Sequence, residues 1–154
     1  MPVEIASLGT LDLGREPALP EAVDIARSLG LDLSGHRARS LRGVDLGDFD
    51  LVLGFERKHV LASVVDAGSA IERTFTLPDL VELLCRIPGP PLPSDPVERA
   101  GVRLRQAHLA RPPGFRTAPM AELTDPLGKT IPAQREIASE LVSMVSQLSH
   151  GLFG

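Results

Sequence analysis

The apolar positions along the chain follow two spacings. Short, nearly continuous apolar runs, typical of strands buried on both faces, occur at Asp50–Phe55 (DLVLGF) and Arg73–Leu77 (RTFTL), and Val3–Ser7 (VEIAS) is a shorter strand candidate. Between these runs the apolar residues recur at helical spacing. One such stretch begins at Pro20 and another contains Val60, and each ends at a glycine, which favours two helices between the strands.

Three further helices are predicted after the third strand. They begin at Pro78, near Pro96 and at about Pro132. The last has four apolar residues on one face: Ile137, Leu141, Val145 and Leu148. This alternation of strands and helices predicts an α/β fold, with a parallel sheet and flanking helices.

Length and composition indicate a single domain over residues 1–154, with a Pro-rich connector at 88–96 inside it. The formal net charge of −4 argues against a nucleic-acid partner, and no apolar run is long enough to cross a membrane. The start, MPVEIAS, lacks the basic and apolar regions of a signal peptide. A single cysteine cannot form an internal disulfide, which is consistent with the cytoplasm.

Five segments in a fixed order carry a family resemblance. They are IASLGT (Ile5–Thr10), GREP (Gly14–Pro17), LGLDLSGHRAR (Leu29–Arg39), DFDLVLGFERKHV (Asp48–Val60) and DPLG (Asp125–Gly128). Together they resemble the low-molecular-weight protein tyrosine phosphatase family, in the style of its actinobacterial members. Arsenate reductases of the same fold are similar too, but they need additional redox cysteines. The resemblance covers most of the chain.

The resemblance implies phosphomonoester hydrolysis, of phosphotyrosine in particular, through a phosphocysteine intermediate and without a cofactor or metal. The substrate would be a phosphorylated protein or a small phosphomonoester. A thiolate attacks phosphorus, and the Asp of an Asp-Pro loop protonates the leaving phenolate and later activates water. Asp125 matches that acid, and Pro126 and Gly128 would shape its turn. The alternative is an ordinary turn, because Asp before Pro commonly opens one.

The nucleophile of the family has no match in these residues. Its loop, a Cys followed six positions later by Arg, lies in a strand-loop-helix unit of roughly 30 residues that the family places before the VEIAS strand, and this unit is expected to be absent from the chain. Cys85 lies in the apolar run LVELLCR, and Pro91 stands six positions on. We therefore expect Cys85 to be a buried structural thiol and the chain to be inactive by itself.

Two further residues match the substrate side of the family site. The family usually has aromatic residues that form a slot for the phosphotyrosine ring, whereas this chain has Leu127 and the segment Leu11–Leu13 in those places. His36, in SGHRAR, would assist the phosphate loop through hydrogen bonds, or would be a loop histidine that caps nearby backbone groups.

The other histidines give no sign of a metal site. His59 is expected on the surface of a helix, and His108 and His150 show no ligand spacing with each other or with Cys85.

Five arginines form a local positive excess within residues 99–116. They are Arg99, Arg103, Arg105, Arg111 and Arg116. If these arginines faced the active-site cleft that the resemblance implies, they would recruit a phosphorylated substrate. The alternative is a solvated helix face, on which Arg99 and Arg103 pair with acids such as Glu98.

Two classes of function follow. In the first, the protein is a phosphatase whose functional form carries the phosphate loop upstream of Met1. In the second, it is a non-catalytic, phosphatase-like interaction module. An in-frame Cys and Arg at the motif spacing, upstream in the coding sequence, favours the first, and a stop codon there favours the second.

The chain is predicted to self-associate. In the family the absent strand lies between the strands that match VEIAS and DLVLGF, so both would have unpaired edges that pair readily with another chain. We expect oligomers or poor solubility in size-exclusion chromatography with multi-angle light scattering. A sharp monomeric peak together with a cooperative melt would contradict this expectation.

Overall fold

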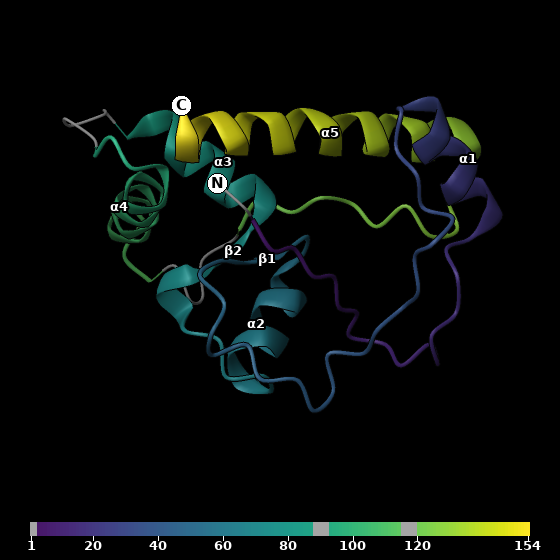
Figure 1. The fold of residues 1–154 in the computed structure, drawn as a ribbon, viewed down its shortest axis with the longest axis horizontal. Helices are drawn as coiled ribbons and strands as arrows, with labels where there is room; N and C mark the ends of the chain where they lie inside the picture. Colours follow the sequence, from purple (N-terminus) through teal and green to yellow (C-terminus); the bar gives the residue numbers. More distant parts are fainter. Residues whose placement is uncertain (1–2, 88–92, 115–119) are drawn as a thin grey trace.

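Two short parallel strands form the centre of the fold (Figure 1). The computed structural model describes residues 3–87, 93–114 and 120–154. Its elements, in chain order, are α1 (Pro20–Ser28), β1 (Val52–Gly54), α2 (Arg57–Val65), the 3₁₀ turn η1 (Ile71–Arg73), β2 (Thr74–Thr76), α3 (Leu77–Arg86), α4 (Pro96–Leu109) and α5 (Ile131–Phe153). Figure 1 shows α2 on one side of the strands and α5 on the other. The predicted α/β fold is confirmed.

The strands β1 and β2 pair in parallel, with Leu53 opposite Phe75. All three residues of β2 are buried, whereas Leu53 in β1 is 39% exposed. The predicted strands at 50–55 and 73–77 are therefore confirmed, each as a shorter element. Within the described residues no strand other than β2 pairs with β1.

The predicted strand at Val3–Ser7 is wrong. These residues are exposed and carry no strand. The first pairing occurs at Gly9, whose N–H donates to Arg39 O at 2.8 Å and whose C=O accepts from Leu41 N at 2.8 Å. A strand exists only where a neighbour pairs with its N–H and C=O groups, and none lies beside this segment among the described residues.

Four of the described helices begin at, or directly before, the prolines that the sequence indicated. Pro20, Pro78, Pro96 and Pro132 each lie in the first turn of a helix, where the missing proline N–H costs no intrahelical bond. Asp95 caps α4 through its Oδ1 atom, which accepts from two backbone N–H groups at 2.9 and 3.0 Å. None of the described helices combines the length and apolar character that crossing a membrane requires.

The core lies between β2, α3, α4 and α5. Its buried members are Phe75, Leu77, Leu80, Val81, Leu83, Leu84, Leu104, Ala107, Leu148 and Leu152. The predicted inner face of α5 needs one correction, because Val145 is 50% exposed while Met144 packs against the core. A Cβ on Gly151 would lie 3.2 Å from the Cβ of Leu84, so glycine there lets α5 approach α3 closely.

The prediction that Cys85 is buried is wrong, since the structure leaves this residue exposed on α3. Pro78 and Val81 lie on the same side of α3 as Cys85, in the earlier turns of the helix, and both are buried. Cys85 lies in the last turn, where this side of the helix is exposed. The apolar sequence LVELLCR had suggested burial along the whole segment.

The expectation of a solvated arginine face on α4 is also wrong for Arg103, which is 7% exposed. Its guanidinium donates to Leu84 O at 2.9 Å and to Gly151 O at 3.0 Å. One turn earlier, Arg99 donates to Phe153 O at 2.6 Å. The last carbonyls of a helix have no intrahelical donor, so these arginines cap the ends of α3 and α5 and do not pair with Glu98.

Arg111 makes similar contacts just beyond α4. Its guanidinium lies 3.8 Å from the centre of the Phe75 ring and donates to Ile71 O at 2.8 Å and to Thr74 O. The carboxylate of Asp79 is 4.0 Å from Nε of Arg111. Burial raises the pKa of Asp79, although the charge of Arg111 opposes that rise. Burial likewise lowers the pKa of Arg111, against the attraction of Asp79.

Two arginines of the predicted set remain. Arg105 is exposed, as expected for a solvated helix face. Arg116 lies outside the described residues, as do positions 88–92 of the Pro-rich segment.

Arg103→Lys is expected to lower the free energy of unfolding by about 2 kcal/mol, because an ammonium cannot bond the carbonyls that the planar guanidinium reaches. The matched control, Arg105→Lys, exchanges the same side chains on the exposed side of α4 and should change stability by less than about 0.5 kcal/mol. Urea denaturation followed by circular dichroism measures both. Equal stability of the two variants would show that the Arg103 bonds are dispensable.

Candidate functional site

The segment before Asp125 lies across the carboxyl ends of both strands. At the end of β2, the hydroxyl of Thr76 donates to Ala121 O at 2.7 Å. Just past the end of β1, Leu123 N donates to Phe55 O at 2.9 Å. The carboxyl edge of a parallel sheet is where α/β proteins place their ligand sites. The chain thus brings its Asp-Pro turn to that edge.

A third bond ties this segment to α2. The carboxylate of Glu122 accepts from Arg57 N, at the start of the helix, at 2.7 Å. A carboxylate there also faces the positive end of the helix dipole. Leu123 beside it is 5% exposed, so one apolar side chain and three hydrogen bonds hold the residues that precede Asp125.

Asp125 opens a tight turn. Its Oδ1 accepts from Leu127 N at 2.8 Å, and Lys129 N donates to Pro126 O at 3.1 Å. Gly128 has a φ of +74°, a conformation that favours glycine. The turn expected from the sequence is therefore present. Asp125 is exposed, which leaves its carboxylate accessible to a ligand in solution.

A cation and several carboxylates surround this turn. Lys58 Nζ lies 2.9 Å from Oε1 of Glu56. This hydrogen bond, followed by the negative charges of Glu56, Asp125 and Glu122, raises the pKa of Lys58. Lys58 therefore stays protonated near the Asp125 turn and gives an otherwise acidic edge a positive charge.

His59 has a role that the sequence did not indicate. It was expected on a helix surface, but it is half-buried, and its Nδ1 accepts from Phe55 N at 3.3 Å and from Glu56 N at 3.2 Å. Glu56 in turn accepts from the backbone of His59, which completes a capping box at the start of α2. In the usual capping box the third helical residue is Glu or Gln, so the sequence motif did not predict a capping role for His59. A Cβ on Gly54 would lie 2.7 Å from the Cβ of His59, so this contact needs glycine.

Among the other predicted site residues that the structure describes, Leu127 contacts Asp125 only through its backbone N–H, and His36 does not bond with it. His36 is half-buried in a loop, where its N–H donates to Leu33 O at 3.0 Å. Across the part of the chain that the structure describes, no hydrogen bond or ion pair links His36 with Asp125. Leu127 is 67% exposed, and Leu11 and Leu13 are exposed too, so these apolar side chains lie in solvent.

The described residues offer no metal centre, since no three His, Cys, Asp or Glu side chains among them are placed to hold an ion. Cys85 is eight residues beyond Leu77, where α3 begins, and is therefore about 12 Å along the helix from the carboxyl end of β2.

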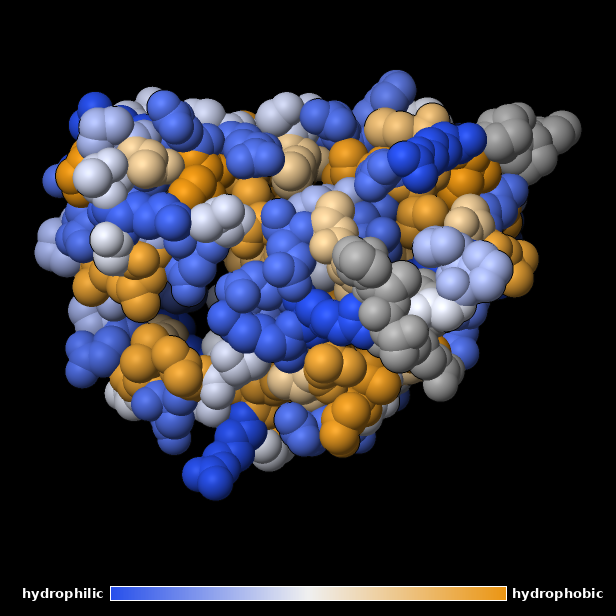
Figure 2. All heavy atoms as spheres, turned by 180° about the vertical axis from the view of Figure 1, so that it is seen from behind, coloured by the Kyte–Doolittle hydropathy of each residue, from blue (hydrophilic) through white to orange (hydrophobic). Residues whose placement is uncertain are grey.

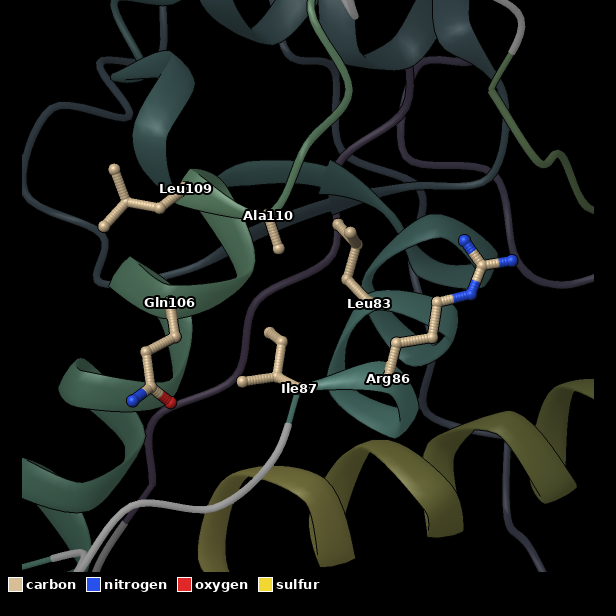
Figure 3. A pocket seen from close by; sticks show the side chains of 6 residues that line it. All are labelled: Leu83, Arg86, Ile87, Gln106, Leu109 and Ala110. Carbon is tan, nitrogen blue, oxygen red and sulfur yellow. The ribbon is translucent and has the colours of Figure 1, made fainter.

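A hollow of about 430 Å³ lies between α3 and α4, away from these residues (Figure 3). Its lining is mainly apolar: Leu83, Arg86, Ile87, Gln106, Leu109 and Ala110. None of the predicted site residues lines it. On the face shown in Figure 2, hydrophobic surface forms several separate areas among hydrophilic ones.

Glu122→Ala is expected to loosen the Asp125 turn, because Arg57 N loses its acceptor. The amide of Leu123, which donates to Phe55 O, should exchange with solvent about fivefold faster, as the loss of one hydrogen bond worth about 1 kcal/mol requires. NMR-detected hydrogen exchange measures this rate. Glu136→Ala, which removes an exposed carboxylate from α5, is the control and should leave the rate unchanged. An unaltered rate in Glu122→Ala would show that the other bonds hold the turn alone.

No protein-family model matches the chain. The similar proteins found by sequence and by structure are both low molecular weight protein tyrosine phosphatases. The chain is 34% identical over 58 residues to the low molecular weight protein-tyrosine-phosphatase Etp of Escherichia coli strain K12, and equally to that of Escherichia coli O157:H7. These residues are 38% of this chain and 39% of each relative, so the match spans about two fifths of the curated proteins.

The structural match is broader. A crystal structure of the low molecular weight protein tyrosine phosphatase from T. tengcongensis superimposes with a TM-score of 0.64 at 24% sequence identity. The match covers 96% of this chain and 76% of the solved one. The chain therefore has the α/β fold of a low molecular weight protein tyrosine phosphatase.

Proposed function

We propose that this chain is a low molecular weight protein-tyrosine-phosphatase-like protein of the actinobacterial type. The family reaction is hydrolysis of a phosphomonoester, phosphotyrosine in particular, through a phosphocysteine. The observation that carries the proposal is the position of Asp125. In a chain with this fold, an exposed Asp-Pro turn is tied to the carboxyl ends of both strands, at the edge where α/β proteins bind ligands.

Asp125 would act as general acid and then as general base. A tyrosine leaving group has a pKa of about 10, so a proton from a nearby carboxylic acid eases its departure at neutral pH. The same carboxylate would then take a proton from the water that hydrolyses the phosphocysteine. Lys58, which pairs with Glu56 at 2.9 Å, partly offsets the negative charge of the carboxylates around the turn.

The nucleophile has to come from outside residues 1–154. The sequence has one cysteine, Cys85, with Pro91 rather than Arg six positions on, and Cys85 is exposed on α3. A phosphate loop binds its anion with backbone N–H groups at a helix N-terminus, which also lowers the pKa of the attacking thiol. We propose that activity requires an additional strand-loop-helix unit with Cys and Arg, and that residues 1–154 alone are inactive.

The second candidate is a non-catalytic interaction module with the same fold. It applies if no unit with Cys and Arg accompanies these residues, because Cys85 has no phosphate-binding loop in its own sequence. The partner in either case is a phosphorylated protein or a small phosphomonoester, with no nucleic acid and no membrane. We also propose self-association through the second edge of β1, beside which no strand lies among the described residues. The single cysteine supports a cytoplasmic location.

The test compares residues 1–154 with a longer form that includes the upstream coding sequence. The longer form should hydrolyse p-nitrophenyl phosphate and aryl phosphates, and residues 1–154 should not, since positioning and charge stabilisation supply most of the catalysis. In the longer form, Asp125→Asn should reduce kcat by roughly 10²- to 10⁴-fold. The reduction should shrink for acidic phenols, which leave without protonation.

The matched control is Asp66→Asn, which removes an exposed carboxylate at the end of α2 and should leave kcat unchanged. If Asp125→Asn reduced kcat equally for all leaving groups, Asp125 would only shape the turn and would not act as the acid. An inactive longer form, or a stop codon directly upstream, would favour the interaction module. Turnover by residues 1–154 that disappears in Cys85→Ser would overturn the assignment of the nucleophile.

A further inference from the structure

Two loop segments that are distant in sequence meet near residues 16 and 38 (Figure 1). The backbone of Ala38 donates to Glu16 O at 2.9 Å, and Pro17 forms an antiparallel bridge with Arg37. Each joined segment carries arginine beside the contact. We call the resulting surface the basic patch, and it consists of Arg15, Arg37, Arg39 and Arg42.

The backbone determines where these side chains lie. Along residues 36–40 exposed and half-buried residues alternate, so Arg37 and Arg39 face solvent while Ala38 and Ser40 face the protein. Gly9 holds this stretch from the protein side through its bonds to Arg39 O and Leu41 N, both at 2.8 Å. The two arginines therefore project from the same side of one extended segment.

Arg15 is held at the tip of the opposing loop. It has a φ of +68° and follows Gly14 at +55°, and Glu16 N donates to Leu13 O at 3.0 Å. This is a type I′ turn, in which a residue other than Gly, Asn or Asp is uncommon. A backbone conformation of this kind that disfavours a long side chain is often retained at a functional position.

The positive charge of the patch is not neutralised within the described structure. The segment 33–44 holds three arginines and no Asp or Glu, and the opposing loop has Arg15 with one acid beside it, Glu16. The ion pairs between described residues involve Arg27, Lys58, Arg86 and Arg111, and none involves the patch. Arg37 donates to Ser34 O at 3.2 Å and to His36 O at 2.6 Å, which fixes its guanidinium without consuming its charge. The four arginines thus give this junction a local excess of positive charge on a chain of net charge −4.

We propose that the basic patch binds the acidic residues that flank the phosphorylated side chain of a polypeptide substrate. This inference rests on the proposed function and narrows its substrate class. Arginine binds carboxylates and phosphates through two parallel N–H groups, so several arginines on one surface favour a partner with several anionic groups.

Local charge limits the partner to a short segment. Acids border the arginine-containing stretch at Asp32 on one side and at Asp45 and Asp48 on the other, and they would repel a long polyanion. The patch also contains no aromatic residue on which bases could stack, and the chain has no Trp or Tyr. These features favour an acidic peptide over a nucleic acid.

The test measures binding by fluorescence anisotropy with residues 1–154, which need no turnover for this purpose. The probes are a labelled peptide with phosphotyrosine among Glu and Asp residues, the same peptide with unmodified Tyr, and the phosphopeptide with Ala in place of the acids. Both acidic peptides should bind, with affinity that falls as salt rises, and the Ala peptide should bind about tenfold more weakly.

The triple variant Arg15→Gln, Arg39→Gln, Arg42→Gln should weaken binding of the acidic peptides about tenfold, since each exposed ion pair adds little and three act together. None of the three side chains makes a hydrogen bond or ion pair with another described residue, so the variant should melt at the wild-type temperature. Unchanged affinity for the acidic peptides would overturn the proposal.

The matched control removes three arginines outside the patch: Arg27→Gln, Arg105→Gln and Arg135→Gln. This control variant should bind the acidic peptides with an affinity within about twofold of the wild type. Loss of binding in this control as large as in the patch variant would overturn the proposal, because net charge alone would explain it. Binding of single-stranded DNA, or of vesicles with anionic phospholipids, as tight as that of the acidic peptides would overturn it too.

Failure of the proposed function gives a different result. Asp125→Asn should bind the acidic peptides as the wild type does, because the acid acts on the leaving group and not on the flanking residues. If no longer form hydrolyses phosphate while the patch variant still loses affinity, the phosphatase proposal fails and the patch remains a binding surface for acidic peptides. If hydrolysis occurs but the patch variant binds normally, only the patch proposal fails.

Discussion

Backbone carbonyls at the ends of helices, and the arginines that bond them, determine how this small fold is assembled. The central sheet has only two strands of three residues, too small to organise the helices by itself. Arg103 connects α4 to the last turns of α3 and α5, and Arg111 connects the end of α4 to η1 and β2. The carbonyls that Arg103 bonds lie at helix ends and those that Arg111 bonds lie in η1 and β2, and each would cost free energy if it were buried without a donor.

The same constraint places the candidate site. The carboxyl ends of β1 and β2 need partners, and the residues before Asp125 provide them through Ala121 O and Leu123 N. Because these bonds fix the segment at the edge of the sheet, the Asp-Pro turn that follows is held there as well. The same hydrogen bonds therefore pair polar groups at the ends of the strands and hold the exposed carboxylate of Asp125 near them.

Arginine has two distinct uses in this chain. Arg103 and Arg111 are buried and bond carbonyls, whereas Arg15 and Arg39 are exposed and belong to the basic patch. The planar guanidinium suits both uses, since it bonds several acceptors at once in the interior and anions at the surface. A concentration of arginines in the sequence therefore says little about ligand binding until the burial of each residue is known.

The sequence by itself determined the features that depend on a few neighbouring residues. Proline in the first turn located helix starts such as that of α4, the apolar runs located β1 and β2, and Asp125 with Pro126 predicted the turn. It also gave the α/β class and the family resemblance, which the structural match to a low molecular weight phosphatase supports as a fold.

The tertiary structure alone decided the features that depend on distant partners. Val3–Ser7 has strand-like residues but no neighbouring strand among the described residues, and Cys85 has an apolar sequence context but lies exposed in the last turn of α3. Arg103 is buried because Gly151, 48 residues away, presents a carbonyl that needs a donor. Propensity and capping act within a turn or two of the chain, whereas burial and long-range hydrogen bonds depend on where other elements pack.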